Sequence, residues 1–225
     1  MDDLQLLHPG GGGAAAQLVV FDFDGTLADT IPLIVQSFHH TLATSGLPAV
    51  GDVEARSWIG RPLQPVLEDR YPGRGAELTA TYREWNLAKH DELIESVPGM
   101  PELLNALTDG GIRLGVVSSK KAETVRQGLR VVGLADQIDV LAGMDETPRH
   151  KPDPQPLLYA AERLGVAPSD CVYIGDADVD VLAARAAGMY AIAVTWGAGT
   201  AEVLRGSEPD ALVDSVDELR DLLLR

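Results

Sequence analysis

The chain has 225 residues and a formal charge of −16, because 34 Asp and Glu outnumber 18 Lys and Arg. This charge would repel nucleic-acid phosphates and anionic membrane surfaces, so neither is an expected partner. Hydrophobic residues make up 45% of the chain, an ordinary globular composition, and a single Cys excludes an internal disulfide. We therefore expect a cytoplasmic protein with one large domain, or a large domain that carries a small one. Nothing in the sequence indicates an oligomeric state.

The predicted elements begin after a Gly- and Ala-rich leader, residues 1–17. Short apolar runs rich in β-branched residues predict buried strands at 18–21, 112–117, 171–174, 190–194 and 211–213. Between them, apolar positions at helical spacing predict helices around 103–107, 125–132, 157–164 and 181–186, each followed by a glycine. This alternation predicts an α/β fold with a parallel sheet covered by helices on both faces.

Residues 28–97 interrupt the alternation. Apolar positions at helical spacing recur in 31–42 and 78–93, whereas no convincing strand is present. We predict a helical domain at 29–97, inserted into an α/β domain made of residues 18–28 and 98–225. Because two crossings of the chain join these parts, a hinge between them is physically possible.

Two acidic residues follow the first predicted strand. Side chains alternate along an extended segment, so Asp22 and Asp24 point the same way and can share one site. Gly25 then allows a sharp turn. Two carboxylates held close together repel, which suits either a metal site or a pair in which one member keeps its proton.

Polar residues also follow two other predicted strands. Ser118 and Ser119 come after 112–117, and Asp176 comes after 171–174. Ligands of an open parallel sheet bind at the carboxyl ends of its strands, so these side chains are expected at one edge with Asp22 and Asp24. Asp178 is expected to cap the following helix.

The four lysines of the chain include one in an unusual setting. Lys151 is followed by prolines at 152, 154 and 156, which stiffen the backbone around it. Taken alone, such a lysine indicates a surface loop. Lys120, directly after the two serines, is expected to face solvent.

Together these motifs resemble those of the haloacid dehalogenase-like superfamily of phosphohydrolases. The resemblance covers residue 19 to about residue 222. In chain order the matching segments are Asp22-Phe23-Asp24-Gly25-Thr26, Gly115-Val116-Val117-Ser118, Lys151-Pro152 and Gly175-Asp176-Ala177-Asp178-Val179-Asp180. The helical insert looks like the C1-type cap of the branch that contains phosphoglycolate phosphatase and β-phosphoglucomutase. The implied fold is a Rossmann-like sheet with an inserted cap.

The resemblance implies a role for each acidic residue. Asp22 would be the nucleophile that becomes an aspartyl phosphate, and Asp24 would be the general acid and then the base. Mg²⁺ would be bound by Asp22, by the backbone carbonyl of Asp24 and by Asp176.

The resemblance also implies residues that bind the substrate. Ser118, with Ser119 beside it, and Lys151 would hold the oxygens of the transferred phosphoryl group. Asp180 would support Lys151 or the metal shell. Arg61, in the predicted cap, would bind an anionic group of the substrate.

The function expected from the resemblance is a Mg²⁺-dependent phosphatase that acts on a small phosphorylated metabolite. The alternatives are a sugar phosphomutase similar to β-phosphoglucomutase and a pyrophosphatase. A non-catalytic regulatory protein on the same fold is disfavoured, because the predicted nucleophile, acid, lysine and metal ligand are all present. A dehalogenase is disfavoured because Asp24 supplies an acid and base that the dehalogenases of this superfamily lack. A phosphonatase is disfavoured because it needs a lysine in the cap, and Lys89 lies late in the predicted cap, not where that family places it.

Overall fold

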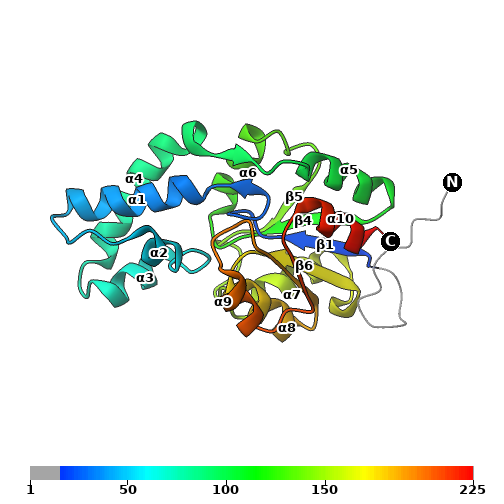
Figure 1. The fold of residues 1–225 in the computed structure, drawn as a ribbon. Helices are drawn as coiled ribbons and strands as arrows, with labels where there is room; N and C mark the ends of the chain where they lie inside the picture. The colour runs from blue at the N-terminus through cyan, green and yellow to red at the C-terminus, as the bar shows by residue number, and fades with distance from the viewer. Residues whose placement is uncertain (1–15, 225) are drawn as a thin grey trace.

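A computed structural model describes residues 16–224 of the chain and shows a six-stranded sheet with helices around it (Figure 1). All neighbouring strands are parallel, in the order β5-β4-β1-β6-β7-β8. The strands are β1 (Leu18–Phe21), β4 (Arg113–Val117), β5 (Asp139–Ala142), β6 (Cys171–Gly175), β7 (Tyr190–Val194) and β8 (Ala211–Val213). The predicted α/β fold with a Rossmann-like parallel sheet is confirmed.

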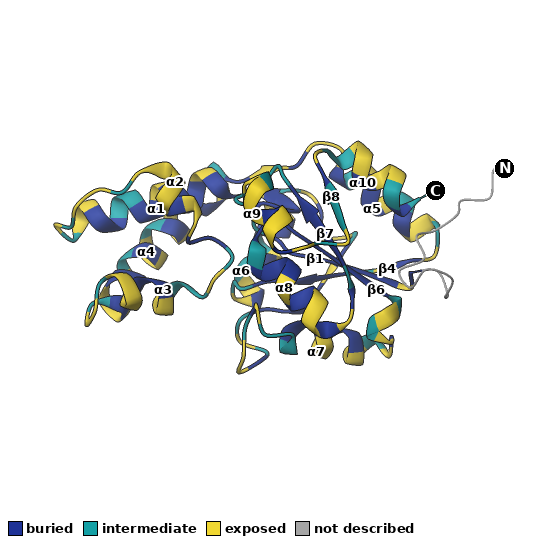
Figure 2. Ribbon diagram, turned by 60° about the horizontal axis from the view of Figure 1, so that its bottom comes forward, coloured by how far each residue is buried: buried dark blue, intermediate teal, exposed yellow. Residues whose placement is uncertain are grey.

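The alternation of side chains along β1 divides the core into two layers. Val19 and Phe21 face one hydrophobic cluster, and Leu18 and Val20 face the other. The first cluster is covered by α5 (Met100–Asp109), α6 (Ala122–Val131) and α10 (Val216–Leu223). The second is covered by α7 (Gln155–Leu164), α8 (Asp178–Ala187) and α9 (Ala201–Gly206). Figure 2 shows the strands buried between helices that expose only their outer faces.

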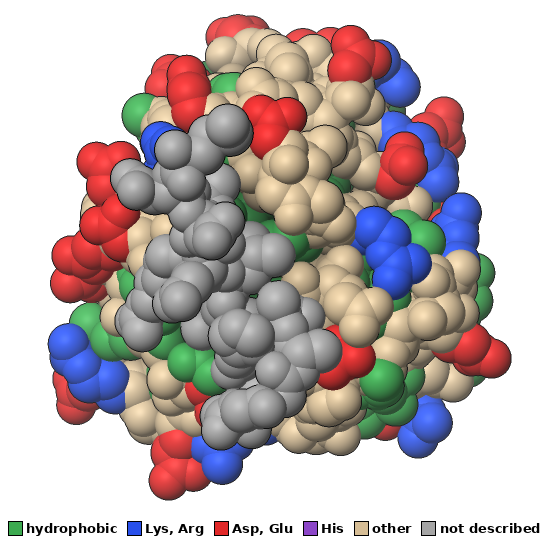
Figure 3. All heavy atoms as spheres, turned by 90° about the vertical axis from the view of Figure 1, so that its right-hand side faces the viewer, with side chains coloured by type: hydrophobic (Ala, Val, Ile, Leu, Met, Phe, Trp, Pro, Cys, Tyr) green, Lys and Arg blue, Asp and Glu red, His purple; other side chains and the backbone are tan. Residues whose placement is uncertain are grey.

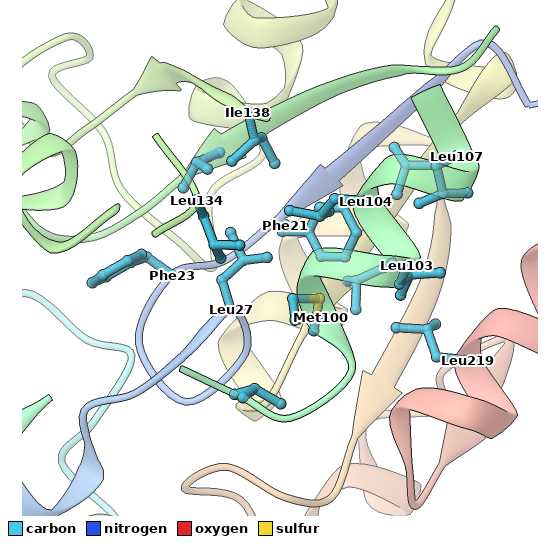
Figure 4. Packing of buried hydrophobic residues seen from close by; sticks show 14 of the residues in the cluster. Phe21, Phe23, Leu27, Met100, Leu103, Leu104, Leu107, Leu134, Ile138 and Leu219 are labelled. Atoms are coloured by element: carbon cyan, nitrogen blue, oxygen red, sulfur yellow. The ribbon is translucent and has the colours of Figure 1, made fainter. Parts of the chain in front are cut away.

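The packing of the first layer explains why β1 is held so firmly. Phe21 points from β1 toward Leu103 and Leu104 of α5, and Leu219 of α10 closes the same layer (Figure 4). These side chains are at most 1% exposed. Fully burying a side chain of this size stabilises the fold by about 1.5–3 kcal/mol. The strand that carries the predicted nucleophile at its end is therefore rigidly positioned.

A separate group of helices lies beyond the carboxyl end of β1, where the strand arrow points in Figure 1. It consists of α1 (Ile31–Thr44), α2 (Asp52–Arg56), α3 (Leu63–Arg70) and α4 (Gly75–Leu93). This helical group has its own hydrophobic cluster, centred on Phe38, whose ring lies 4.9 Å from the rings of Trp58 and Tyr82. On this separate core we propose that residues 29–97 form a cap domain and that 18–28 with 98–225 form the main domain.

Two short strands join the helical group to the sheet. β2 (Ala28–Asp29) and β3 (Glu95–Ser96) pair antiparallel where the chain enters and leaves the group. The expectation of no strand in this region is wrong, because two residues are too few to produce a periodic pattern. No pattern in the sequence predicts β5, a four-residue strand at one edge of the sheet.

The described region begins just inside the predicted leader. Residues 1–15 of that leader lie outside the described residues. Ala16 is 4% exposed and belongs to the first cluster, and the backbone of Gln17 bonds to Asp170 and Arg113. Packing therefore extends at least two residues before the predicted start of the ordered chain. Across residues 16–224, no helix combines the length and apolar character that crossing a bilayer requires.

Acidic side chains are spread over one face of the molecule (Figure 3). On the face shown in Figure 3, Asp and Glu lie around the rim with Lys and Arg between them. The charge of −16 is therefore not confined to one patch of this face.

Candidate active site

The sheet order brings three predicted site residues to one edge. β1 lies between β4 and β6, with Phe21 paired to Val116 on one side and Ile174 on the other. Asp22, Ser118 and Asp176 follow these three strands directly, and each is at most 5% exposed. Because the strands are parallel and in register, their carboxyl ends meet at a topological switch point, where open sheets bind ligands.

Lys151 enters this edge from the loop before α7, although a lone lysine before prolines indicates a surface loop. It is 2% exposed. Its Nζ donates to Asp180 Oδ1 at 2.6 Å and to the Tyr173 hydroxyl at 3.0 Å, and it lies 3.1 Å from Asp22 Oδ1. The Tyr173 hydroxyl donates in turn to the carbonyl of Val117. The ammonium is therefore linked to β6 through Tyr173 and, by way of that hydroxyl, to β4 through Val117.

Three buried carboxylates form a cluster around this ammonium. Oxygens of Asp22, Asp176 and Asp180 all lie within 4.8 Å of one another. Burial raises the pKa of Asp22 from 3.8 to about 7, against the lowering effect of Lys151. Burial also raises the pKa of Asp176 well above its usual range, and the charges of Asp180 and Asp22 add to this. The cluster therefore holds more negative charge than Lys151 alone balances.

The free lone pairs of the cluster are not equally distributed. Asp180 uses Oδ1 for Lys151 and Oδ2 for the backbone N–H of Ala177. Asp22 Oδ1, by contrast, is buried and accepts no hydrogen bond from the described residues. Asp176 Oδ1 receives only a 3.4 Å bond from Thr26. The oxygens that remain available to a metal or a phosphoryl group are thus Oδ1 of Asp22 and Oδ1 of Asp176.

Glycines allow the backbone to pack directly on Asp176. Gly25 has φ +74°, a conformation that favours glycine, and a Cβ there would collide with the Asp176 carboxylate. Gly197 approaches the same carboxylate, and the next residue, Ala198, donates its N–H to Asp176 Oδ2 at 2.6 Å. These contacts fix the orientation of the carboxylate and leave no room for a larger residue.

Asp24 lies beside the cluster and has different partners. Its Oδ1 accepts from the Lys120 ammonium at 2.5 Å and from the Thr30 hydroxyl at 2.7 Å. The Lys120 side chain is 17% exposed. The expectation that Lys120 faces solvent is therefore wrong. It turns inward because Asp24 offers it a charge-assisted hydrogen bond at the edge of the sheet. The Asp24 side chain does not belong to the carboxylate cluster. This agrees with the expectation that Asp24 would offer a metal its backbone carbonyl rather than its side chain.

We predict that Lys120→Met slows turnover by about tenfold for substrates with poor leaving groups, because Asp24 loses the cation that positions it. The effect should be smaller with p-nitrophenyl phosphate, whose leaving group needs little protonation. Steady-state kcat measured across phosphate esters of rising leaving-group pKa checks this. Equal slowing for every ester would contradict a role through Asp24. Lys89→Met is the matched control, because the structure pairs Lys89 only with Glu92.

The remaining predicted residues lie around the entrance. Ser118 Oγ accepts from the backbone N–H of Lys120 at 3.2 Å, which leaves its proton available. Ser119 Oγ donates to the Gly60 carbonyl at 2.9 Å and so contacts the helical group. The Arg61 guanidinium pairs with Asp178 at 2.7 Å. The structure thus places Ser119 and Arg61 where the helical group meets the sheet.

The start of α8 differs from the expected cap. Asp178 is the first residue of α8 and Ala177 is its N-cap. The Asp180 carboxylate accepts from Ala177 N–H, whereas Asp178 accepts from Arg61 and from the N–H of Val179 in the first turn of α8. The prediction that Asp178 caps the helix is wrong, because Asp180, one turn along, reaches back to the cap position.

A cavity of about 290 Å³ lies over this edge of the sheet. Asp22, Asp24, Ser118, Ser119 and Arg61 line it. The rest of its wall comes mostly from the helical group, including Phe38, Trp58, Tyr82 and Asn86. The sequence did not identify these wall residues as functional.

A buried aspartate thus lies beside a buried ammonium at the switch point of the parallel sheet, where the helical group meets the sheet. The chain belongs to the haloacid dehalogenase-like hydrolases, whose family model matches residues 19–194, and within them to the phosphatases.

Two curated relatives and one solved structure illustrate the similarity. Pyrophosphatase PpaX of Halalkalibacterium halodurans is 35% identical over 205 residues, covering 91% of this chain and 95% of that one. Phosphoglycolate phosphatase of Nitrosococcus oceani is 31% identical over 220 residues, covering 92% and 96%. A haloacid dehalogenase-like hydrolase from Streptococcus pneumoniae superposes with a TM-score of 0.82 at 25% identity, covering 90% and 96%.

Proposed function

We propose that the chain is a Mg²⁺-dependent phosphatase that hydrolyses a small phosphorylated metabolite through an aspartyl phosphate on Asp22. The observation that supports it most directly is the buried Oδ1 of Asp22, which accepts no hydrogen bond from any residue between 16 and 224 and lies 3.1 Å from the Lys151 ammonium. A nucleophile needs a free lone pair, and a nearby fixed cation attracts the phosphoryl oxygens.

The residues divide the reaction into two steps. In the first, an oxygen of Asp22 forms a bond to phosphorus while the bond to the leaving oxygen breaks, and Asp24 gives that oxygen a proton. In the second, Asp24 takes a proton from water, which attacks phosphorus, releases inorganic phosphate and restores Asp22. Ser118 and Lys151 hold the phosphoryl oxygens throughout, and Asp180 positions Lys151.

The donor set fits a small divalent cation. Mg²⁺ prefers carboxylate and carbonyl oxygens in an octahedron, with opposite ligands about 4 Å apart. The ligand oxygens of Asp22 and Asp176 lie within 4.8 Å of each other, so both can approach one ion. We infer that Asp22, Asp176 and the Asp24 carbonyl hold the ion. When bound, it would neutralise charge on the phosphoryl group.

The cavity supports a small substrate. Its volume of about 290 Å³ suits a metabolite rather than a polymer, in keeping with the acidic surface. Pyrophosphate is a second candidate substrate, because a relative at 35% identity is named a pyrophosphatase. Arg61 lines the cavity beside its partner Asp178, where its guanidinium is available to an anionic group of the substrate.

The experiment that tests this proposal is hydrolysis of p-nitrophenyl phosphate and of a metabolite panel that includes pyrophosphate, each with Mg²⁺. We expect phosphate release without any sugar bisphosphate primer, and kcat/KM across the panel identifies the substrate. A requirement for such a primer would favour the phosphomutase alternative. Absence of turnover in folded, Mg²⁺-loaded protein would overturn the proposal.

We predict that Asp24→Asn still binds phosphate but turns over slowly, by a factor of about 10² or more, with poor leaving groups. The amide cannot donate the proton that the leaving oxygen needs. Inhibition by inorganic phosphate, measured beside kcat for an alkyl phosphate, checks both halves of the prediction. Wild-type rates with an alkyl phosphate would show that Asp24 is not the acid.

A further inference from the structure

The wall of the cavity that faces the sheet contains a polar pair in an apolar setting. Tyr82 and Asn86 lie one turn apart on α4, so they share a helix face, and both line the cavity. They are 8% and 6% exposed. Most of the neighbouring wall residues from the helical group are apolar, among them Ile34, Phe38, Trp58, Ile59 and Leu63, and the charged exceptions are Arg61 and Arg83. Burying a carboxamide costs free energy unless its polar atoms form hydrogen bonds, so each polar atom of Asn86 should have a partner.

The partners of Asn86 determine which way its carboxamide points. The Ser37 hydroxyl donates its only proton to the Leu33 carbonyl at 2.7 Å. Toward Asn86 it can therefore only accept, and the Asn86 NH₂ group lies 2.9 Å from Ser37 Oγ. The amide nitrogen thus faces Ser37. The hydrogen-bond network itself decides which end of the carboxamide is nitrogen and which is oxygen.

The carboxamide oxygen of Asn86 is consequently free. It accepts no hydrogen bond from any residue within 16–224, and it is not among the fully enclosed polar atoms without a partner. It is therefore open to the cavity that Asn86 lines. A carboxamide oxygen is an acceptor only, so its ligand must bring a hydroxyl or N–H group.

This polar pair lies on the leaving-group side of the cavity. Asp24 lines the same cavity as Tyr82 and Asn86, so the Tyr82–Asn86 face of α4 and Asp24 face one enclosed space. Asp24 is the proposed proton donor to the leaving group. A substrate with its phosphoryl group on Asp22 and Lys151 would extend its other end toward this face of α4.

We propose that Asn86 is a specificity-determining residue that accepts a hydrogen bond from a hydroxyl of the leaving group, so that the preferred substrates are phosphate esters of polyhydroxylated alcohols. This inference rests on the proposed phosphatase function. It favours esters of this class over pyrophosphate and phosphoglycolate, which when ionised offer no donor to an acceptor oxygen. A site with a buried acceptor discriminates strongly against an analogue that lacks the matching donor.

The test compares two esters that differ only in hydroxyl groups, glycerol 1-phosphate and propyl phosphate. For the wild type we expect kcat/KM to favour glycerol 1-phosphate by about tenfold or more. Asn86→Leu, which keeps the number and branching of the side-chain heavy atoms, should bring the ratio to about one while kcat/KM for propyl phosphate stays within about threefold. Thr41→Val is the matched control, because Thr41 is buried on α1 but does not line the cavity. It should keep the wild-type ratio.

Two results would overturn the inference: a wild-type ratio near one, or an unchanged ratio in Asn86→Leu. Failure of the phosphatase proposal is distinguishable, because the wild type would then hydrolyse neither ester nor p-nitrophenyl phosphate. In that event calorimetric binding of the two esters in Mg²⁺ decides the question. Tighter binding of glycerol 1-phosphate that is lost in Asn86→Leu supports the subsite, and equal binding in both proteins contradicts it.

Discussion

Asp22→Asn should lower kcat by about 10³-fold or more, because an amide nitrogen is a poor nucleophile toward phosphorus. Asp22 is 3% exposed, follows β1 directly and has a free oxygen beside Lys151. No other described carboxylate combines these features, since Asp180 is fully engaged, Asp24 is held by Lys120, and Lys151 forms ion pairs with Asp22 and Asp180 but not with Asp176. Another group is therefore not available to replace it.

The measurement is single-turnover hydrolysis of p-nitrophenyl phosphate, with acid-quenched protein analysed by mass for a phosphorylated aspartate. The wild type should show a transient mass increase of one phosphoryl group, and Asp22→Asn should show none. Asp139→Asn is the matched control, because Asp139 is exposed at the start of β5. Activity of Asp22→Asn within about tenfold of the wild type would remove Asp22 from the nucleophile role.

The part of the site that was predictable from the sequence is the part attached to strands. Asp22, Ser118 and Asp176 each follow an apolar run directly, so a parallel sheet places them together whatever the loops do. Lys151 could be placed only through the family resemblance. Its position depends on Tyr173 and Asp180, which lie 22 and 29 residues away in the sequence.

The contacts that the sequence did not predict join segments that only the tertiary structure brings together. Lys120 and Asp24 are 96 residues apart, and Asn86 and Ser37 are 49 apart. Neither pair has a local pattern, and a lysine beside another lysine in a loop is more typical of a solvated surface. In the fold, the short β2–β3 pairing was missed for the same reason, because it joins Ala28 to Ser96 and Asp29 to Glu95, which lie far apart in the sequence.

The surplus of acidic residues has a local counterpart at the site. Asp22, Asp176 and Asp180 surround the single ammonium of Lys151, so full ionisation leaves two negative charges unbalanced in a buried place. A buried charge without a partner is costly, and a group in this position keeps its proton instead. The raised pKa values of Asp22 and Asp176 express this cost. A divalent cation is the counter-charge that the cluster lacks.

Removal of divalent metal should therefore abolish turnover and destabilise the fold at neutral pH. Without a cation, the pKa of Asp22 is about 7 in the folded protein against 3.8 ordinarily. The folded state then binds more protons than the unfolded state between these values, so its stability falls as pH rises from about 4 to about 7. Mg²⁺ binds the ionised carboxylate and releases that proton, so its stabilising effect should grow over the same range.

The measurement is the melting temperature with chelator and with millimolar Mg²⁺, at about pH 5.5 and about pH 8. We expect the increase caused by Mg²⁺ to be larger at the higher pH, and activity lost in chelator to return on adding Mg²⁺. Asp22→Asn has no ionisable group at this position. Mg²⁺ should therefore raise its melting temperature by less, and that increase should depend less on pH. An equal increment at both pH values in the wild type would show that Asp22 does not bind the ion. Turnover that persists in chelator would show that the carboxylate cluster works without a metal, with Lys151 as its only cation.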